Sequence, residues 1–283
     1  MPRHFRACLL LLVCSLITSG CFTSVTTIKV KPDGSGTIEQ SIAMKAEAAA
    51  QLTAMAATFG DTAGKDGDKA ASPPELFSEK DMREAATKFG EGVTFVSSQP
   101  IKTKDLVGRV ATYSFADITK VRVNQKPPSP KGAPGEPASK AKGAGAESED
   151  VSFKFLRHPA GTSVVTVVFP EPDLSKKKDK DAESETESKK PDPAQLAMMK
   201  KMLDGLRIEI GLEVAGAIVK TNSPYVQGSK VTLLEMDFAE LMTNDAVLGK
   251  LANPESIEEA KQILKDVKGV KVNLDREVSV EFK

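Results

Sequence analysis

The chain contains few of the residues that build covalent, metal-binding or sugar-binding sites. Its 283 residues include no tryptophan, 2 tyrosines, 2 histidines and 3 cysteines. The shortage of tryptophan and tyrosine argues against a sugar-stacking surface, which depends on the flat faces of these side chains. The 39 basic and 39 acidic residues cancel, so the chain lacks the positive excess that holds the phosphates of a nucleic acid. We therefore expect no nucleic-acid partner.

The N-terminal segment lacks an apolar run long enough to cross a bilayer as a helix. Arg3 and Arg6 precede a short apolar stretch over residues 9–16, whereas a spanning helix needs roughly 20 apolar residues. A positive segment followed by a short apolar core is typical of an export signal. Thr18-Ser19-Gly20 then precede Cys21, and this order resembles the lipobox of bacterial lipoproteins, although the family most often has leucine at the position of Thr18.

The lipobox resemblance implies a lipid anchor. It implies that the signal peptide over residues 1–20 is removed and that Cys21 carries the acyl chains, palmitate among them. The mature protein would then be held to a membrane on the extracytoplasmic side of the cell envelope. Phe22 follows the cysteine instead of the aspartate that retains lipoproteins at the inner membrane, which favours the outer membrane, facing the periplasm, in a host with two membranes. The alternative is an ordinary secretory signal with an incidental cysteine.

The remaining cysteines offer no cross-link or metal site. Cys8 and Cys14 lie inside the signal, so the mature chain has no cysteine pair for a disulfide or a metal. We expect no cofactor, and we expect packing alone to stabilise the fold.

Two segments have too few apolar residues to fold. Residues 125–149 contain no large apolar side chain, and residues 171–193 carry a single Leu174 among dense mixed charge. Neither can bury enough apolar surface to offset the entropy of ordering. We interpret both as disordered loops of a single domain over residues 21–283, because the hairpin expected between them is marginal without neighbouring strands. The alternative is that they are linkers between domains.

The rest of the chain alternates strand and helix patterns. Period-two alternation predicts strands at residues 25–31, 37–44, 93–98, 107–115, 120–124, 206–219, 230–238 and 277–282, and two more around a turn within 151–169. Three-to-four spacing predicts helices at residues 44–59, 78–90, 194–204, 238–251 and 255–267. Gly216 falls on the apolar face of its strand, which predicts a bulge or bend. Because hairpins cluster and no βαβ series is present, we expect an α+β fold with a mainly antiparallel sheet and several packed helices.

The order of several features resembles the LppM-type lipoprotein domain of actinobacteria. They are a hairpin with the turn Pro32-Asp33-Gly34 shortly after Cys21, the strand Gly108–Phe115, and Thr221-Asn222-Ser223 ahead of Gly228–Thr232. The resemblance implies an α/β domain with an apolar cavity, proposed in that family to hold lipid or glycolipid. It assigns no ligand residue to any position of this chain.

Motifs for catalysis or metal binding are incomplete. His158 is the histidine that remains after signal removal, and we interpret it as an exposed turn residue rather than a catalytic one. Gly60–Lys65 has one residue too few between its glycines for a phosphate-binding loop, and Asp66 replaces the serine or threonine that meets magnesium. Asp61, Asp66 and Asp68 lack the spacing and the bidentate glutamate of a calcium loop. No carboxylate pair stands out as the acid and base of a glycosidase. We expect that the protein is not an enzyme.

One apolar pattern suggests a ligand site. The strand at 206–219 is strongly apolar on one face, and the segments near it are rich in methionine, which adapts to irregular apolar partners. One interpretation is an ordinary core, and the other is a sheet folded around a lipid or another apolar ligand, with neighbouring helices as a lid. The candidate apolar lining consists of Ile208, Ile210, Leu212, Met199 and Met236.

Three classes of function fit these observations. The first is a non-enzymatic, membrane-anchored module that binds a lipid or another apolar ligand. The second is a structural or interaction subunit of an envelope complex, with an unidentified protein partner. The third is a hydrolase with an unrecognised site. A large apolar cavity indicates the first, a flat apolar patch of several hundred Å² the second, and a cleft with clustered carboxylates the third. We place the binding module first.

Overall fold

The computed structural model describes nine parts of the chain. They are residues 22–50, 53, 77–125, 150–159, 161–170, 205–243, 257–265, 267–273 and 275–283. Cys21, the helix expected at 194–204 and nearly all of the two expected loops lie outside these residues. Within the described parts, no helix is long and apolar enough to cross a membrane.

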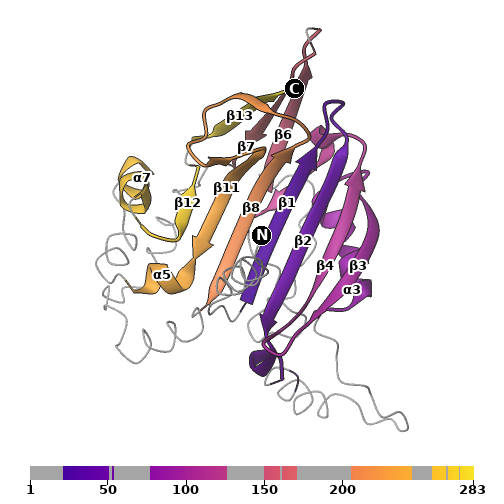
Figure 1. Cartoon of the computed structure of the whole chain (residues 1–283), viewed down its shortest axis with the longest axis vertical. Coiled ribbons are helices and arrows are strands. Elements are labelled where there is room, and N and C mark those ends of the chain that lie inside the picture. The colour runs from indigo at the N-terminus through magenta and orange to yellow at the C-terminus, as the bar shows by residue number, and fades with distance from the viewer. Residues whose placement is uncertain are drawn as a thin grey trace, which may run out of the picture.

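Two β-sheets make up most of the described structure (Figure 1). The strands of the large sheet are β1 (Phe22–Val30), β2 (Gly36–Lys45), β3 (Thr94–Lys102), β4 (Leu106–Phe115), β8 (Leu206–Val214), β10 (Val226–Gln227), β11 (Lys230–Asp237) and β12 (Val270–Val272). Their order is β10-β11-β8-β1-β2-β4-β3, and β12 also pairs with β11. The strands of the small sheet are β5 (Val123–Asn124), β6 (Asp150–Arg157), β7 (Ser163–Val168), β9 (Ile218–Thr221) and β13 (Glu277–Phe282). Their order is β5-β6-β7-β13-β9.

The described helices are few and short. They are α3 (Glu79–Ala85), the 3-10 turns η1 (Ala86–Phe89) and η2 (Ile118–Lys120), α5 (Phe238–Met242) and α7 (Ile257–Lys265). The expectation of an α+β fold with several packed helices is therefore confirmed only in part: α3, α5 and α7 lie where helices were expected, but the described residues are mainly β. The helix expected over 44–59 begins at residue 46, because Met44 and Lys45 still belong to β2, and it is described at residues 46–50 and 53.

The helix expected from Ser78 to Gly90 is confirmed in position and caps. The Ser78 hydroxyl accepts a hydrogen bond from the Asp81 N–H, as the capping pattern predicts. Gly90 ends the segment with φ of 114°, a value that favours glycine. Ala86 is buried and Ala85 is not, because the last turn tightens from α to 3-10 and shifts the buried face.

The expected hairpins are confirmed. β1 pairs with β2, β6 with β7, and β8 with β11, all antiparallel. The β6–β7 hairpin joins a larger sheet through β13, as a marginal hairpin requires.

The large sheet is mixed rather than antiparallel throughout. β1 and β8 pair in parallel, from Phe22 opposite Leu206 to Val30 opposite Val214. The expectation of mainly antiparallel pairing is confirmed, because every other pair of the described strands is antiparallel. Period-two alternation reports which face of a strand is buried but not which strand lies beside it.

Gly216 divides the strand expected over 206–219 into two strands in two different sheets. β8 ends at Val214 in the large sheet, and β9 begins at Ile218 in the small sheet. Gly216 has φ of 153°, and a Cβ placed there would lie 2.2 Å from the Lys283 carbonyl oxygen. The N–H of the neighbouring Ala217 donates to that same oxygen at 2.9 Å. The predicted bend is therefore confirmed, and it carries the chain from one sheet to the other.

We expect the Gly216→Ala substitution to lower the free energy of unfolding by about 2–3 kcal/mol, because it adds a backbone clash to a strained φ. Gly228→Ala is the matched control, since Gly228 also has a positive φ (61°) but no atom within 4 Å of the position that a Cβ would take. Urea denaturation of both variants measures the difference. Equal losses of unfolding free energy in the two variants would show that the close contact between a Cβ at position 216 and the Lys283 carbonyl oxygen does not destabilise the fold.

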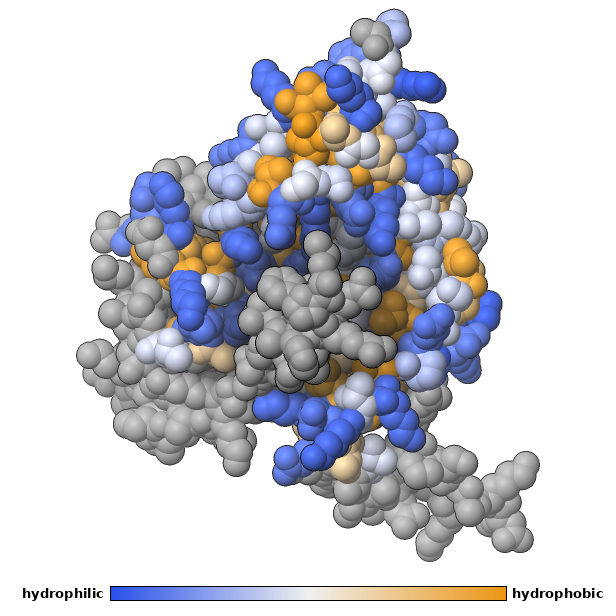
Figure 2. All heavy atoms as spheres, viewed as in Figure 1, coloured by the Kyte–Doolittle hydropathy of each residue, from blue (hydrophilic) through white to orange (hydrophobic). Residues whose placement is uncertain are grey.

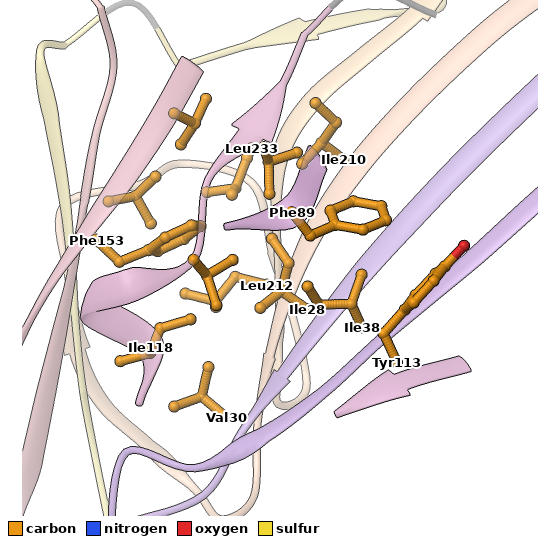
Figure 3. Close-up of a cluster of buried hydrophobic side chains, with 14 of the residues drawn as sticks. Ile28, Val30, Ile38, Phe89, Tyr113, Ile118, Phe153, Ile210, Leu212 and Leu233 are labelled. Atoms are coloured by element: carbon orange, nitrogen blue, oxygen red, sulfur yellow. The ribbon is translucent and has the colours of Figure 1, made fainter. Parts of the chain in front are cut away.

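The two sheets enclose one hydrophobic core (Figure 3). Ile28, Val30 and Leu212 enter it from the large sheet, and Phe153 enters it from β6. We call the face of the large sheet that bears these residues the inner face. The small sheet is fixed at the end of β1 that carries Val30, where the Ser163 hydroxyl donates to the Pro32 carbonyl oxygen at 2.8 Å.

Candidate functional site

The inner face is organised as rows of side chains that cross several strands. Ile28, Ile38, Tyr113 and Leu212 form one such row, because they lie opposite one another in register. All four are fully buried and belong to the core between the sheets. This row is closely packed core, which we call the closed row. Any ligand would therefore have to lie beyond it.

The next two rows toward Phe22 differ from it because polar and apolar side chains are separated along them. In the first, Ile210 lies opposite Thr26, and Thr26 lies opposite Gln40. In the second, Ile208 lies opposite Ser24, and Ile42 separates Ser24 from Arg109. We call these two rows the candidate site. Its polar half consists of Ser24, Thr26, Gln40 and Arg109. Its apolar half consists of Ile208, Ile210, Leu234 and Met236.

The residues of the polar half are nearly buried, and three of their side chains form no hydrogen bond with a described residue. Ser24, Thr26, Gln40 and Arg109 are 4%, 5%, 8% and 8% exposed. Among the described residues, no hydrogen bond reaches the side chain of Ser24, Thr26 or Gln40. The other buried polar side chains behave differently: Ser163 donates to Pro32, and Ser223 and Asn273 bond each other. The side-chain oxygen and nitrogen atoms of these three residues are not fully buried, however, since Arg207 Nε is the one fully buried side-chain atom without a partner in the described part of the chain. Three polar groups therefore stay accessible side by side on an otherwise apolar face, where they are available to bond a ligand.

Arg109 places a positive charge at one end of the polar half. Its Nε–H donates to the Phe77 carbonyl oxygen at 2.8 Å, and Nη1 donates to the Ser98 hydroxyl at 3.0 Å. The Phe77 ring lies beside that of Phe22, with ring centroids 6.4 Å apart. The segment that leads into α3 therefore lies against the inner face at the candidate site.

Tyr113 holds α3 in the same place. Its hydroxyl donates to the Met82 carbonyl oxygen at 3.0 Å, and the Phe89 and Phe95 rings pack around its ring at centroid distances of 4.9 and 6.0 Å. Burial raises the pKa of the Tyr113 hydroxyl, so it remains protonated and continues to donate. The candidate site thus has a fixed boundary on the side of β4.

The residues expected to line a ligand site divide into three groups. Ile208, Ile210 and Met236 lie together in the apolar half. Leu212 lies in the closed row instead, so we leave it out of the candidate site. Met199 and the lipidation site Cys21 lie outside the described residues.

The polar half was missed from the sequence. Ser24 and Thr26 precede Ile28 at period two, so they continue the buried face of β1 with polar residues. This pattern is present in the sequence, but polar residues at the start of an ordinary strand give the same pattern. Gln40 and Arg109 could not be added without the pairing of β1, β2 and β4.

Titratable groups elsewhere form a ladder of ion pairs on the opposite face of the large sheet. Glu209 contacts Arg207 and Lys230 at 3.3 and 2.6 Å, and Glu235 contacts Arg207 and Lys271 at 3.0 and 2.7 Å. Each of these carboxylates therefore lies between two cations.

The remaining candidates from the sequence are His158 and the motifs for metal or phosphate binding. His158 lies in the β6–β7 turn, where its N–H donates to the Thr162 carbonyl oxygen. Over the described ranges, no group of three or more histidine, cysteine, aspartate or glutamate side chains is placed to hold a metal ion. Gly60–Lys65 and the aspartates at 61, 66 and 68 lie outside these ranges.

Comparison with known proteins gives one structural match. No protein-family model matches the chain, and no curated protein matches it. Among solved structures, the NMR structure of the folded domain of LppM from Mycobacterium tuberculosis is similar, with 10% sequence identity and a TM-score of 0.30. The match covers 94% of this chain and 92% of that one. LppM is also the lipoprotein type that the sequence resembles.

Proposed function

We propose that this protein is a non-enzymatic lipoprotein of the cell envelope that binds an amphiphilic lipid across the candidate site. The observation that carries the proposal is a group of three polar side chains on the inner face that bond no described residue and keep their polar atoms accessible, Ser24, Thr26 and Gln40. A polar head group would bond these three side chains. An acyl chain would lie along Ile208, Ile210, Leu234 and Met236 on the neighbouring strands.

The separation of polar and apolar residues fits an amphiphile better than a purely apolar ligand. Adjacent strands lie about 4.8 Å apart, so the polar half on β1, β2 and β4 spans roughly 10 Å. That width suits a lipid head group. Apolar contact then contributes about 25 cal/mol for each Å² of chain removed from water, while the head group bonds the hydroxyls and the amide.

The anchor is part of the same proposal. Acylation of Cys21 with two chains gives stable membrane attachment, where one chain gives only marginal binding. The protein would then lie on the extracytoplasmic side of its membrane, the outer one in a host with two.

The alternative function, an accessory subunit, requires a continuous apolar surface. The large exposed hydrophobic residues of the described structure lie instead on four different strands: Val96, Leu156, Val219 and Val226.

The double variant Thr26→Val, Gln40→Leu tests the ligand proposal. It replaces accessible polar groups that bond no described residue by apolar groups of similar shape, so we expect the stability of the ligand-free domain to stay within about 1 kcal/mol of the wild type. We expect the same variant to lose most of its co-purifying lipid, because the head group loses its partners. Thermal unfolding of delipidated protein and mass spectrometry of extracted lipid measure the two effects.

Thr27→Val, Ser41→Leu is the matched control. Thr27 and Ser41 follow the two site residues along the same strands, and their side chains point to the opposite face of the sheet. The control should retain the lipid of the wild type. A double site variant that is destabilised and keeps its lipid would show that Thr26 and Gln40 are ordinary structural residues.

A further inference from the structure

The large sheet begins directly after the expected site of lipidation. Phe22, the first residue of β1, is adjacent in sequence to Cys21, and its N–H donates to the Gly205 carbonyl oxygen at 3.3 Å. Consecutive Cα atoms are only about 3.8 Å apart. An acylated Cys21 would therefore have no linker between its lipid and a central strand of the sheet.

The neighbouring strands place two lysine-bearing segments at the same end of the sheet. Phe22 lies opposite Met44, so Lys45 follows immediately at that end, and Lys45 in turn lies opposite Leu106. The turn between β3 and β4 contains the exposed Lys104. Figure 2 shows hydrophilic side chains gathered at the lower end of the molecule, where β2 and the β3–β4 turn end in Figure 1. We call the end of the large sheet that carries Phe22, Lys45 and Lys104 the anchor end.

The opposite end of the sheet carries the small sheet and the C-terminus. β1 has nine residues, which at about 3.3 Å per residue separates the two ends by about 30 Å. Lys31 lies in the turn that follows β1, and the Ser163–Pro32 hydrogen bond fixes the small sheet beside it. Figure 1 shows β6, β7 and β13 at the top of the molecule and the starts of β1 and β8 lower down.

We propose that the domain docks end-on against the bilayer that holds its acyl chains, with the anchor end at the lipid head groups and the small sheet facing away. This inference rests on the proposed acylation of Cys21 and adds an orientation to it. Ser24 and Thr26 lie two and four residues from Phe22, about 7 and 13 Å along the strand. The candidate site is then next to the membrane, and its lipid is drawn from the membrane rather than from water.

A pair of cysteine variants tests this orientation in the full lipidated protein. Lys104→Cys and Lys31→Cys replace exposed lysines in turns at the two ends of the sheet. Each adds the single reactive thiol, because Cys8 and Cys14 lie in the signal and the Cys21 thiol is acylated. Each variant is labelled with the same fluorophore and bound to phosphatidylcholine vesicles doped with headgroup-spin-labelled phosphatidylcholine. We expect the spin label to quench the fluorophore at position 104 several-fold more than at position 31.

A flexible insertion provides the control. Twelve glycine and serine residues between Cys21 and Phe22 should abolish the difference between the two labels while the protein still sediments with vesicles. Equal quenching of both labels without the insertion, in protein that sediments with vesicles, would overturn the orientation and leave the anchor intact. Failure of the protein to sediment with vesicles would overturn the anchor itself, and the orientation with it.

Discussion

Leu212→Ala should lower the free energy of unfolding by about 4 kcal/mol. Leu212 is fully buried, lies opposite Ile28 on one side and Val231 on the other, and belongs to the core between the sheets. Truncation of such a leucine removes buried apolar contacts and leaves a cavity, which typically costs about 2–5 kcal/mol. Urea denaturation monitored by circular dichroism measures the change.

Leu156→Ala is the control, because Leu156 is 57% exposed. We expect its effect to stay within about 0.5 kcal/mol. The comparison also tests the boundary of the candidate site, since an open lining would tolerate a change at Leu212. A loss below about 1 kcal/mol would place free space at Leu212 and extend the site into the row that we describe as closed.

Cys21→Ser should reduce the incorporation of labelled palmitate to background, because acyl transfer requires the thiol. We expect the variant either to keep its signal peptide or to be released without acyl chains, and the N-terminal mass distinguishes these forms. Cys14→Ser changes a cysteine inside the signal and should leave labelling unchanged. A Cys21→Ser protein that is cleaved at the same place and partitions with membranes like the wild type would show that the chain is not a lipoprotein.

The positions of most strands could be predicted because their cause is local. A strand with one buried face must alternate, and β13 (Glu277–Phe282) alternates over the six residues that the pattern predicts. The turn around Gly34 and the cap at Ser78 are likewise set by neighbouring residues.

The partners of the strands could not be predicted in the same way. β1 and β8 are more than 170 positions apart in sequence and pair in parallel. Neither strand has a sequence feature that identifies the other as its partner. The bend at Gly216 was predicted, but its consequence was not, because the sequence does not show that β9 joins a second sheet.

The candidate site shows the same division between local and long-range information. Its apolar half lies mainly on the alternating strand β8, so Ile208 and Ile210 could be found from sequence. Its polar half is assembled from β1, β2 and β4, and the register alone brings Thr26 beside Gln40. Polar residues on a buried face are the departure from a simple strand pattern that is typical of functional positions.

The most direct measurement of the central claim is native mass spectrometry of the detergent-extracted, lipidated wild-type protein. The covalent acyl chains on Cys21 add a fixed mass, so a non-covalently bound lipid appears as a separate increment. We expect one such lipid per protein molecule, lost when Thr26 and Gln40 are replaced by valine and leucine. A folded wild-type protein without any bound lipid, even after incubation with vesicles, would contradict the account.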